Sequence, residues 1–295
     1  TNFMDFSQYG EQKFLVNNVT QLFVGDKIND FMWNVSGNWQ RGSQQPLTYV
    51  VNGATSAISP ALFLATPGAF DIGGKFNQPT GVIGSASNLV NDQVQGKAKF
   101  AYDLNTTTRA TYTLGLYSND GTAYINNYLV NGGGEYFGGT QQSKLSSAAF
   151  TPNLSSTNAQ SFANGRYRVQ QKLLTNAGAI KSNTGGLFDY EISASNFTYL
   201  ENNTMQPNSG AIPYGGWTST GRVNKLGGTY WTLFDANGIV RPDEGLLKGH
   251  NISFGMHGDQ FNLNNPTYYT LSWPSGEASA YGFAQTIARG TTRTK

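Results

Sequence analysis

The residues with the greatest capacity for chemistry include two histidines. His250 and His257 are the only histidines, and the chain has no cysteine, so a histidine-based metal site or catalytic triad would have to use them. If both lie on one strand, a separation of seven residues places them on opposite faces, and they cannot bind the same metal ion. We expect each to be a polar residue of a lumen or a turn.

Asp189 and Glu191 offer a different chemistry. At positions i and i+2 of a strand their carboxylates share a face, as the acid and nucleophile of a glycosidase could. The alternative is a polar pair in a channel lumen, with its charge balanced by basic residues of neighbouring strands. Those basic residues are Lys97, Lys99, Arg109 and Lys181. We favour the second interpretation and expect no catalytic residue and no enzymatic activity.

Aromatic residues in the segments between strands could bind a ligand through their amphipathic rings, or could pack the loops against one another. The four candidates are Tyr136, Phe137, Tyr214 and Trp217. Motifs for serine hydrolysis, phosphate binding, zinc proteolysis and EF-hand calcium binding do not occur. We therefore expect no metal and no cofactor.

Composition narrows the fold class. Charged residues make up 12% of the chain, against roughly 25% in soluble domains, and aromatic residues make up 13%. The 36 glycines and the many Asn, Ser and Thr residues favour strands and turns over helices. The chain contains no run of about 18 consecutive apolar residues, which is the length that a membrane-spanning helix needs. A net charge of +2 with scattered basic residues indicates no nucleic-acid partner.

A first hairpin is predicted around a turn at residues 105–108. Before it, Phe100 and Tyr102 share one face, with Lys99, Ala101 and Asp103 on the other; after it, Tyr112 and Leu114 alternate with threonines. Each predicted strand is about ten residues long, which is the length of a tilted strand in a membrane barrel.

A second hairpin is predicted over residues 12–40, with a turn at residues 25–30. The apolar face of its second strand carries Phe31, Trp33, Val35 and Trp39. If this strand is tilted by about 40° from the barrel axis, Phe31 and Trp39 lie about 20 Å apart along that axis. This is close to the ~25 Å height of the apolar band in such barrels. With Phe100, Tyr102, Tyr112 and Leu114, these residues form the predicted lipid-facing surface.

Two further hairpins are predicted over residues 168–200 and 228–263, with turns at residues 182–186 and 241–245. The connections between hairpins are long and cover residues 41–92, 121–165 and 201–225. This alternation is typical of barrels with short periplasmic turns and long extracellular loops. We therefore predict an all-β fold: an antiparallel up-and-down transmembrane β-barrel, represented in part by about 8–10 strands.

Four segments resemble the barrel domain of TonB-dependent outer-membrane receptors. They are QLFVGDKINDFMWNVSGNWQ (21–40), AKFAYDLNTTTRATYTLGLYSND (98–120), LLKGHNISFGMHGDQFNLNNPTY (246–268) and GTTRTK (290–295). The resemblance implies a 22-stranded barrel closed around an N-terminal plug. It also implies import of a ferric siderophore or similar scarce nutrient across the outer membrane of a Gram-negative bacterium. The energy would come from the TonB coupling protein, acting through the plug.

The chain departs from that family's pattern. It has fewer predicted strands, no plug-like segment, no partner-binding box near Thr1 and no final strand ending in an aromatic residue. We therefore expect residues 1–295 to form one partial barrel domain that lacks the plug and the C-terminal strands. Its expected partners are outer-membrane lipid, the TonB protein and an iron–siderophore or other small nutrient.

Two other classes of protein stay open. One is a soluble or surface-displayed β-rich domain that binds or hydrolyses carbohydrate, and the other is an adhesin-like surface protein. The strand faces distinguish the classes. In a barrel, Phe31, Trp33, Val35 and Trp39 face lipid, whereas in a soluble sandwich they fill a core.

Overall fold

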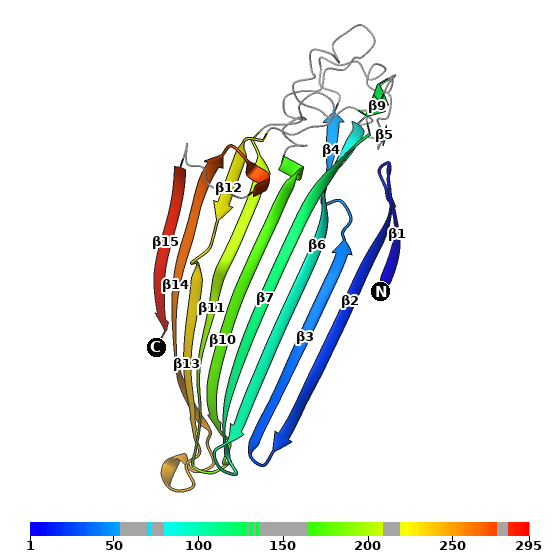
Figure 1. The fold of residues 1–295 in the computed structure, drawn as a ribbon. Coiled ribbons are helices and arrows are strands. Elements are labelled where there is room, and N and C mark those ends of the chain that lie inside the picture. Colours follow the sequence, from blue (N-terminus) through cyan, green and yellow to red (C-terminus); the bar gives the residue numbers. More distant parts are fainter. Residues whose placement is uncertain are drawn as a thin grey trace.

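The computed structural model describes residues 1–53, 70–71, 80–128, 130–131, 134–135, 164–208, 219–275 and 283–294. Within these ranges the fold is all-β, as predicted, and it is dominated by one 13-stranded antiparallel sheet (Figure 1). In the same part of the chain, no helix has the length and hydropathy needed to cross a bilayer.

Long strands make up most of the sheet. In chain order its strands are β1 (Asn2–Gln8), β2 (Glu11–Ile28), β3 (Phe31–Ser43), β4 (Thr48–Gly53), β5 (Phe70–Asp71), β6 (Thr80–Asp103), β7 (Thr108–Asn127), β10 (Tyr167–Ser182), β11 (Phe188–Pro207), β12 (Gly221–Lys225), β13 (Tyr230–Val240), β14 (Ile252–Thr270) and β15 (Phe283–Thr294). Two short strands, β8 (Val130–Asn131) and β9 (Gly134–Glu135), pair only with each other. The 3-10 helices are η2 (Gly245–Leu247) and η3 (Trp273–Ser275).

The strands follow one another across the sheet almost in chain order. The order is β1, β2, β3, β6, β7, β10, β11, then β12 with β13, then β14 and β15. β12 and β13 share one position, because both pair with β11 on one side and β14 on the other. Gly228, with a φ of 82°, lies in the break between them. The prediction of an antiparallel up-and-down arrangement is confirmed.

The described strands form an open sheet and do not close into a barrel. β1 pairs only with β2 and β15 only with β14, and these two strands lie at opposite edges of the sheet (Figure 1). The lower half of β2 has no described neighbour on its outer side, because β1 reaches only as far as Asn17 of that strand. Closure would therefore require further pairing along both edges.

Four short connections lie at one end of the sheet, at the bottom of Figure 1, which we call the turn end; the opposite end is the loop end. The predicted turn at residues 25–30 is shorter than expected, because β2 continues to Ile28 and only Asn29 and Asp30 form the turn. Asn29 has a φ of 54°, which suits a two-residue hairpin. The last turn is longer than predicted and contains η2.

The strands are longer than the predicted ten residues. β6 has 24 residues, and β7 and β11 have 20 each. Parts of the predicted long connections are therefore strand: β6 begins at Thr80, β11 runs to Pro207, and β12 falls wholly within residues 201–225. The alternation of apolar and polar residues ends before the strands do. Toward the loop end both faces become polar, while the backbone hydrogen bonds between strands continue.

The core lies at the loop end. Met205, Val223 and Trp273 form a buried cluster there, and the other buried apolar side chains also belong to this half of the sheet. Those other residues are Leu15, Val50, Val82, Ala86 and Ala123. Among the described residues, the turn half of the sheet thus has no buried apolar core on either face.

Candidate functional site

All eight residues predicted to face lipid lie on one face of the sheet. In the register, Phe31 is opposite Tyr102, Trp33 is opposite Phe100, and Phe100 is opposite Tyr112. Residues directly opposite on paired strands point to the same side. Val35, Trp39 and Leu114 follow by the same alternation. We call this side the apolar face and the other side the polar face.

The apolar face continues across β2, β3, β6, β7, β10, β11, β13 and β14. Its exposed apolar residues include Leu22, Val24, Val35, Tyr102, Tyr112, Leu116, Ile192, Phe254 and Met256. Leu22 is 71% exposed and Phe254 is 57% exposed. Asp26 is the only acidic or basic residue that these eight strands carry on the apolar face between the turn end and the register row of Trp39, with that row itself excluded. No described element covers this face.

A band of charged side chains, which begins in the register row of Trp39 and extends toward the loop end, borders the apolar face on its loop side. We call it the charged row: Arg41, Asp92, Asp120, Arg168, Lys172 and Glu201. Trp39 links the two zones, because its indole Nε1 donates to Asp92 Oδ1 at 2.8 Å. Arg168 Nη2 lies 2.6 Å from Asp120 Oδ2, and Lys172 Nζ lies 2.9 Å from Glu201 Oε2. The change from apolar to charged is therefore abrupt.

The apolar zone runs obliquely to the strands. On β3 it extends from Phe31 to Trp39, and the register places Met256 of β14 in the same row as Phe31. On β14 the apolar residues instead run from Ile252 to Met256, and Gln260 is already polar. The zone therefore shifts toward the turn end from β3 to β14. Tilted strands crossing a layer of constant height produce this shift.

The polar face carries hydroxyl, amide and charged groups. Ser36 lies opposite Lys97, and Asn34 lies opposite Lys99, which in turn lies opposite Thr113. Neither lysine makes an ion pair within the described residues. The prediction that these lysines balance Asp189 and Glu191 is therefore wrong.

Asp189 and Glu191 form ion pairs with cations other than Lys97 and Lys99. Glu191 Oε2 lies 3.0 Å from Lys181 Nζ, as predicted, and Asp189 Oδ2 lies 2.6 Å from Nη1 of Arg241. Arg109, the fourth predicted partner, instead pairs with Asp103 at 2.6 Å. The two predicted carboxylates thus have separate counterions.

Asp189 is buried and organises the turn before it. Its carboxylate accepts hydrogen bonds from the backbone N–H of Thr184 at 2.5 Å and of Gly185 at 3.2 Å. The hydroxyl groups of Ser182 and Thr184 donate at 3.2 and 2.9 Å, and Arg241 donates at 2.6 Å. With these five donors, Asp189 is committed to the β10–β11 turn and is not placed as a catalytic acid or nucleophile.

This geometry gives a direct prediction for Asp189→Asn. The amide cannot accept all five bonds, so the turn should open more often and the backbone N–H groups of Thr184 and Gly185 should exchange with solvent about tenfold faster. Hydrogen exchange read by mass spectrometry or NMR measures this. The matched control is Glu191→Gln, which removes a carboxylate two residues away. Equal exchange in both variants would contradict the assignment.

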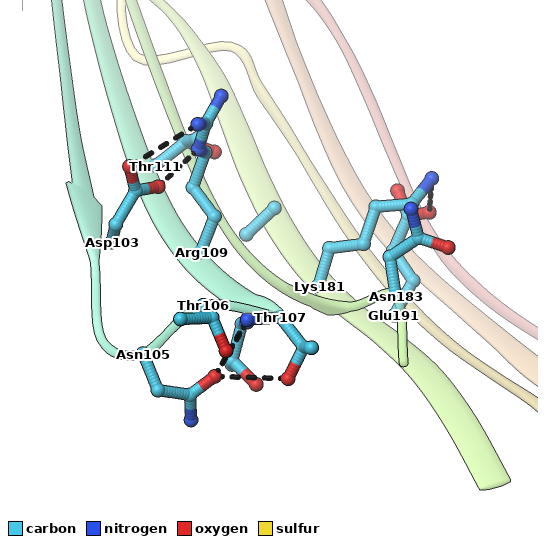
Figure 2. A pocket seen from close by; sticks show the side chains of 11 residues that line it. Asp103, Asn105, Thr106, Thr107, Arg109, Thr111, Lys181, Asn183 and Glu191 are labelled. Carbon is cyan, nitrogen blue, oxygen red and sulfur yellow. Dashed lines mark hydrogen bonds and ion pairs between the residues drawn. The ribbon is translucent and has the colours of Figure 1, made fainter. Parts of the chain in front are cut away.

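A cavity of about 400 Å³ lies on the polar face at the turn end. Figure 2 shows the Asp103–Arg109 pair on one side of it and the Lys181–Glu191 pair on the other. Its hydroxyl groups come from Thr106, Thr107, Thr108 and Thr111. Because every charged side chain in this lining is ion-paired, the cavity is polar but electrically balanced.

The two histidines do not share a strand, so the reasoning that separated them is wrong. His250 lies in the connection before β14, whereas His257 lies within β14. His257 Nδ1 is 2.6 Å from Asp235 Oδ1, and its Nε2 is 3.8 Å from Asp259 Oδ1. Within the described ranges, no group of three or more His, Asp or Glu side chains could hold a metal ion.

Glu11, which sequence reasoning missed, lies at the loop end of β2, outside the apolar zone, and is only 1% exposed. It accepts hydrogen bonds from Ser85 Oγ at 2.7 Å and from Asn126 Nδ2 and Tyr128 OH at 3.0 Å each. Lys13 Nζ lies 2.8 Å from its other oxygen. This carboxylate therefore joins the N-terminal hairpin to β6 and β7.

The protonation of Glu11 should be visible in stability. Burial raises the pKa of its carboxyl, but hydrogen bonds from Lys13, Ser85 and Asn126 outweigh this, so the pKa lies below the ordinary value of 4.5. A lowered folded-state pKa gives stability that is present above pH 4.5 and is lost as the pH falls through the lowered value. We expect the denaturation midpoint to drop in that window, and to drop less in Glu11→Gln. An identical pH profile in the variant would contradict this.

No protein-family model matches the chain, and no curated protein matches its sequence. The resemblance to TonB-dependent receptors therefore depends on the segments quoted above. The four aromatic residues predicted to bind ligand lie outside the described residues, so their role stays a prediction. They are Tyr136, Phe137, Tyr214 and Trp217.

Proposed function

We propose that the chain is part of an outer-membrane transport barrel of the TonB-dependent receptor type. In this proposal it admits a ferric siderophore or a similar scarce nutrient across the outer membrane of a Gram-negative bacterium. The observation that carries the proposal is the exposed apolar face, continuous over eight strands and bounded by the charged row.

An exposed apolar surface of this extent needs a partner. Soluble monomers rarely expose contiguous apolar patches larger than a few hundred Å². Lipid is the partner that suits a surface with apolar residues along every strand, one charged residue near its margin, and a tryptophan at its border with charged groups. The oblique course of the zone supports strands that cross the bilayer at a tilt.

The polar face would then line an aqueous lumen. Lys97 and Lys99 have no described counterion and would keep water beside them. The hydroxyl groups and the balanced cavity at the turn end suit passage of a polar solute. The turn end would face the periplasm, from which the TonB protein would act on the plug inside the barrel, as the resemblance implies.

A soluble carbohydrate-binding or hydrolytic sandwich is less well supported. It needs a second layer over the apolar face, yet the described buried apolar residues gather at the loop end instead. It also needs a free carboxylate pair, whereas Asp189 is held by five donors. We therefore do not propose a reaction.

The membrane part of the proposal is tested with single cysteines, which the chain allows because it has none of its own. Val35→Cys and Ser36→Cys are spin-labelled in protein reconstituted into lipid vesicles. We expect the label at Val35 to collide with oxygen dissolved in lipid and the label at Ser36 to collide with a water-soluble nickel complex. Similar collision rates at the two neighbouring sites would contradict the lipid-facing assignment.

The transport part is tested in cells of the source bacterium. Disrupting the gene that encodes this chain should abolish uptake of a labelled ferric siderophore under iron limitation, and disrupting the gene for the TonB protein should do the same. If the disrupted strain still takes up every siderophore of a test panel at the normal rate, the protein does not transport iron. Other nutrients would then be the candidates for its cargo.

A further inference from the structure

A cavity of about 230 Å³ lies on the polar face at the loop end, and we call it the loop-end pocket. Its lining comes from the end of β11, from β12 and from β14: Thr204, Gln206, Arg222, Asn224 and Thr267. Gln206 lies opposite Arg222, and Asn224 lies opposite Thr204 on one side and Thr267 on the other. These side chains continue the polar face, because Asn202 of β11 lies opposite Gln171, which lies opposite Asn119 of β7. In the proposed orientation the pocket is at the outer mouth of the lumen, where cargo would arrive.

Arg222 is the only charged side chain among the described residues of this lining. With its amide oxygen turned toward Arg222, Gln206 accepts hydrogen bonds from Nε and Nη2 of the guanidinium. Gln206 therefore holds one edge of the guanidinium. The other edge keeps an N–H on Nη1 and an N–H on Nη2, and no described group accepts from either. Two parallel N–H groups of this kind bind a carboxylate bidentately.

The charge of Arg222 has no nearby counterion within the described residues. Along the polar face of β11, β12 and β14, the nearest acidic residue is Asp259, which precedes Thr267 by eight residues, or roughly 26 Å at ~3.3 Å per residue. At the turn end, by contrast, Lys181 pairs with Glu191 at 3.0 Å and Arg241 pairs with Asp189 at 2.6 Å. The loop-end pocket thus carries an uncompensated positive charge, whereas the cavity at the turn end is balanced.

Two neutral side chains can add hydrogen bonds to a bound anion. Thr267 Oγ1 donates to Asn224 Oδ1, which fixes the amide of Asn224 with its oxygen toward Thr267. The Nδ2 group of Asn224 donates to no described group, and it is a donor beside Arg222 in the lining. The hydroxyl of Thr204 is a further donor in the same lining. A guanidinium edge, an amide and a hydroxyl together suit a carboxylate, which can accept about four hydrogen bonds.

We propose that the loop-end pocket binds a carboxylate of the transported cargo, and that the cargo is therefore a ferric chelate with free carboxylate groups. The proposal rests on the proposed function, because the pocket meets cargo only if the polar face lines a lumen. The chemistry of the pocket selects the cargo class. A neutral hydroxamate chelate offers no negative group to Arg222, whereas a carboxylate chelate offers a planar one that matches its free edge.

The experiment measures binding to the full chain reconstituted into nanodiscs, by equilibrium dialysis with radiolabelled iron. The two probes are ferric dicitrate and a neutral ferric trihydroxamate. We expect ferric dicitrate to bind about tenfold more tightly, and we expect Arg222→Gln to lower its affinity about tenfold without changing that of the neutral chelate. Raising the salt concentration should weaken binding of ferric dicitrate to the wild-type chain more than to this variant.

Lys225→Gln is the matched control, since Lys225 also lies on β12 but points to the opposite face, with its Nζ 5.6 Å from the centre of the Tyr268 ring. This variant loses the same charge and should bind ferric dicitrate as the wild-type chain does. An equal loss of affinity in both variants would show that net charge, and not the pocket, attracts the chelate.

The other outcomes separate this inference from the proposed function. Equal affinity for the two chelates, or an unchanged affinity in Arg222→Gln, would overturn the carboxylate site and leave the transport proposal in place. Displacement of ferric dicitrate by an equal concentration of inorganic phosphate would replace it with a general anion site. If iron-free citrate binds through Arg222 but neither chelate binds, the site stands and the proposed transport of iron is wrong.

Discussion

Val35→Arg is expected to destabilise the membrane-inserted fold by about 2–4 kcal/mol, the cost of an arginine on the lipid face near the bilayer midplane. Val35 lies midway between Phe31 and Trp39 on β3 and is 42% exposed on the apolar face. Its directly opposite neighbours on the two paired strands, Val24 and Ala98, are both apolar.

Ser36→Arg is the matched control for this variant. Ser36 is the next residue on the same strand and points to the polar face, opposite Phe23 and Lys97. The same charge there should cost far less, since water would solvate it. Reversible folding into phospholipid vesicles, titrated with denaturant, measures both free energies. Similar losses in the two variants would argue against a lipid-facing surface.

Glu11→Ala is expected to destabilise the loop end by about 3 kcal/mol, because it removes a buried carboxylate that holds a half-buried lysine and three hydrogen-bond donors. The substitution leaves Lys13 without its counterion and leaves Ser85, Asn126 and Tyr128 without their shared acceptor. Because these partners belong to β6 and to the segment at the end of β7, the N-terminal hairpin should loosen from them first.

Denaturant unfolding gives the free-energy change for this variant, and protease cleavage within β1 reports loosening of the hairpin. Glu11→Gln is the control, since its amide oxygen can still accept from some of the three donors and it should lose clearly less stability. A Glu11→Ala protein with wild-type stability would show that the network does not hold the hairpin.

The apolar face and the hairpin order could be predicted from the sequence because each is a local, period-two signal. Phe31, Trp33, Val35 and Trp39 recur at alternate positions, and the register places them on the same face as Phe100 and Tyr112, as expected. The lengths of the strands could not be predicted. From Gln93 to Thr80, β6 carries polar, small and apolar residues on both faces, so periodicity disappears where hydrogen bonding continues.

The polar site was harder to predict because its contacts join distant residues. Glu11 meets Ser85 and Asn126 across separations of 74 and 115 residues, and no local pattern marks such a contact. Asp189 was detectable in part. It follows Ser182, Thr184 and Gly185, whose hydroxyl and backbone N–H groups are typical donors to a turn carboxylate. The pattern was interpreted as a shared strand face instead.

In the proposed membrane orientation, the length of β7 would set how far the protein reaches from the bilayer. The apolar face of this strand ends near Ser118, yet the strand continues to Asn127. Those nine residues, at ~3.3 Å each and with a tilt of about 40°, would raise the loop end by roughly 20–25 Å. Large binding partners such as antibodies or phage could then contact the loop end of the protein at a distance from the lipid headgroups. The strand ends, and not the bilayer, would form the platform from which cargo is first captured.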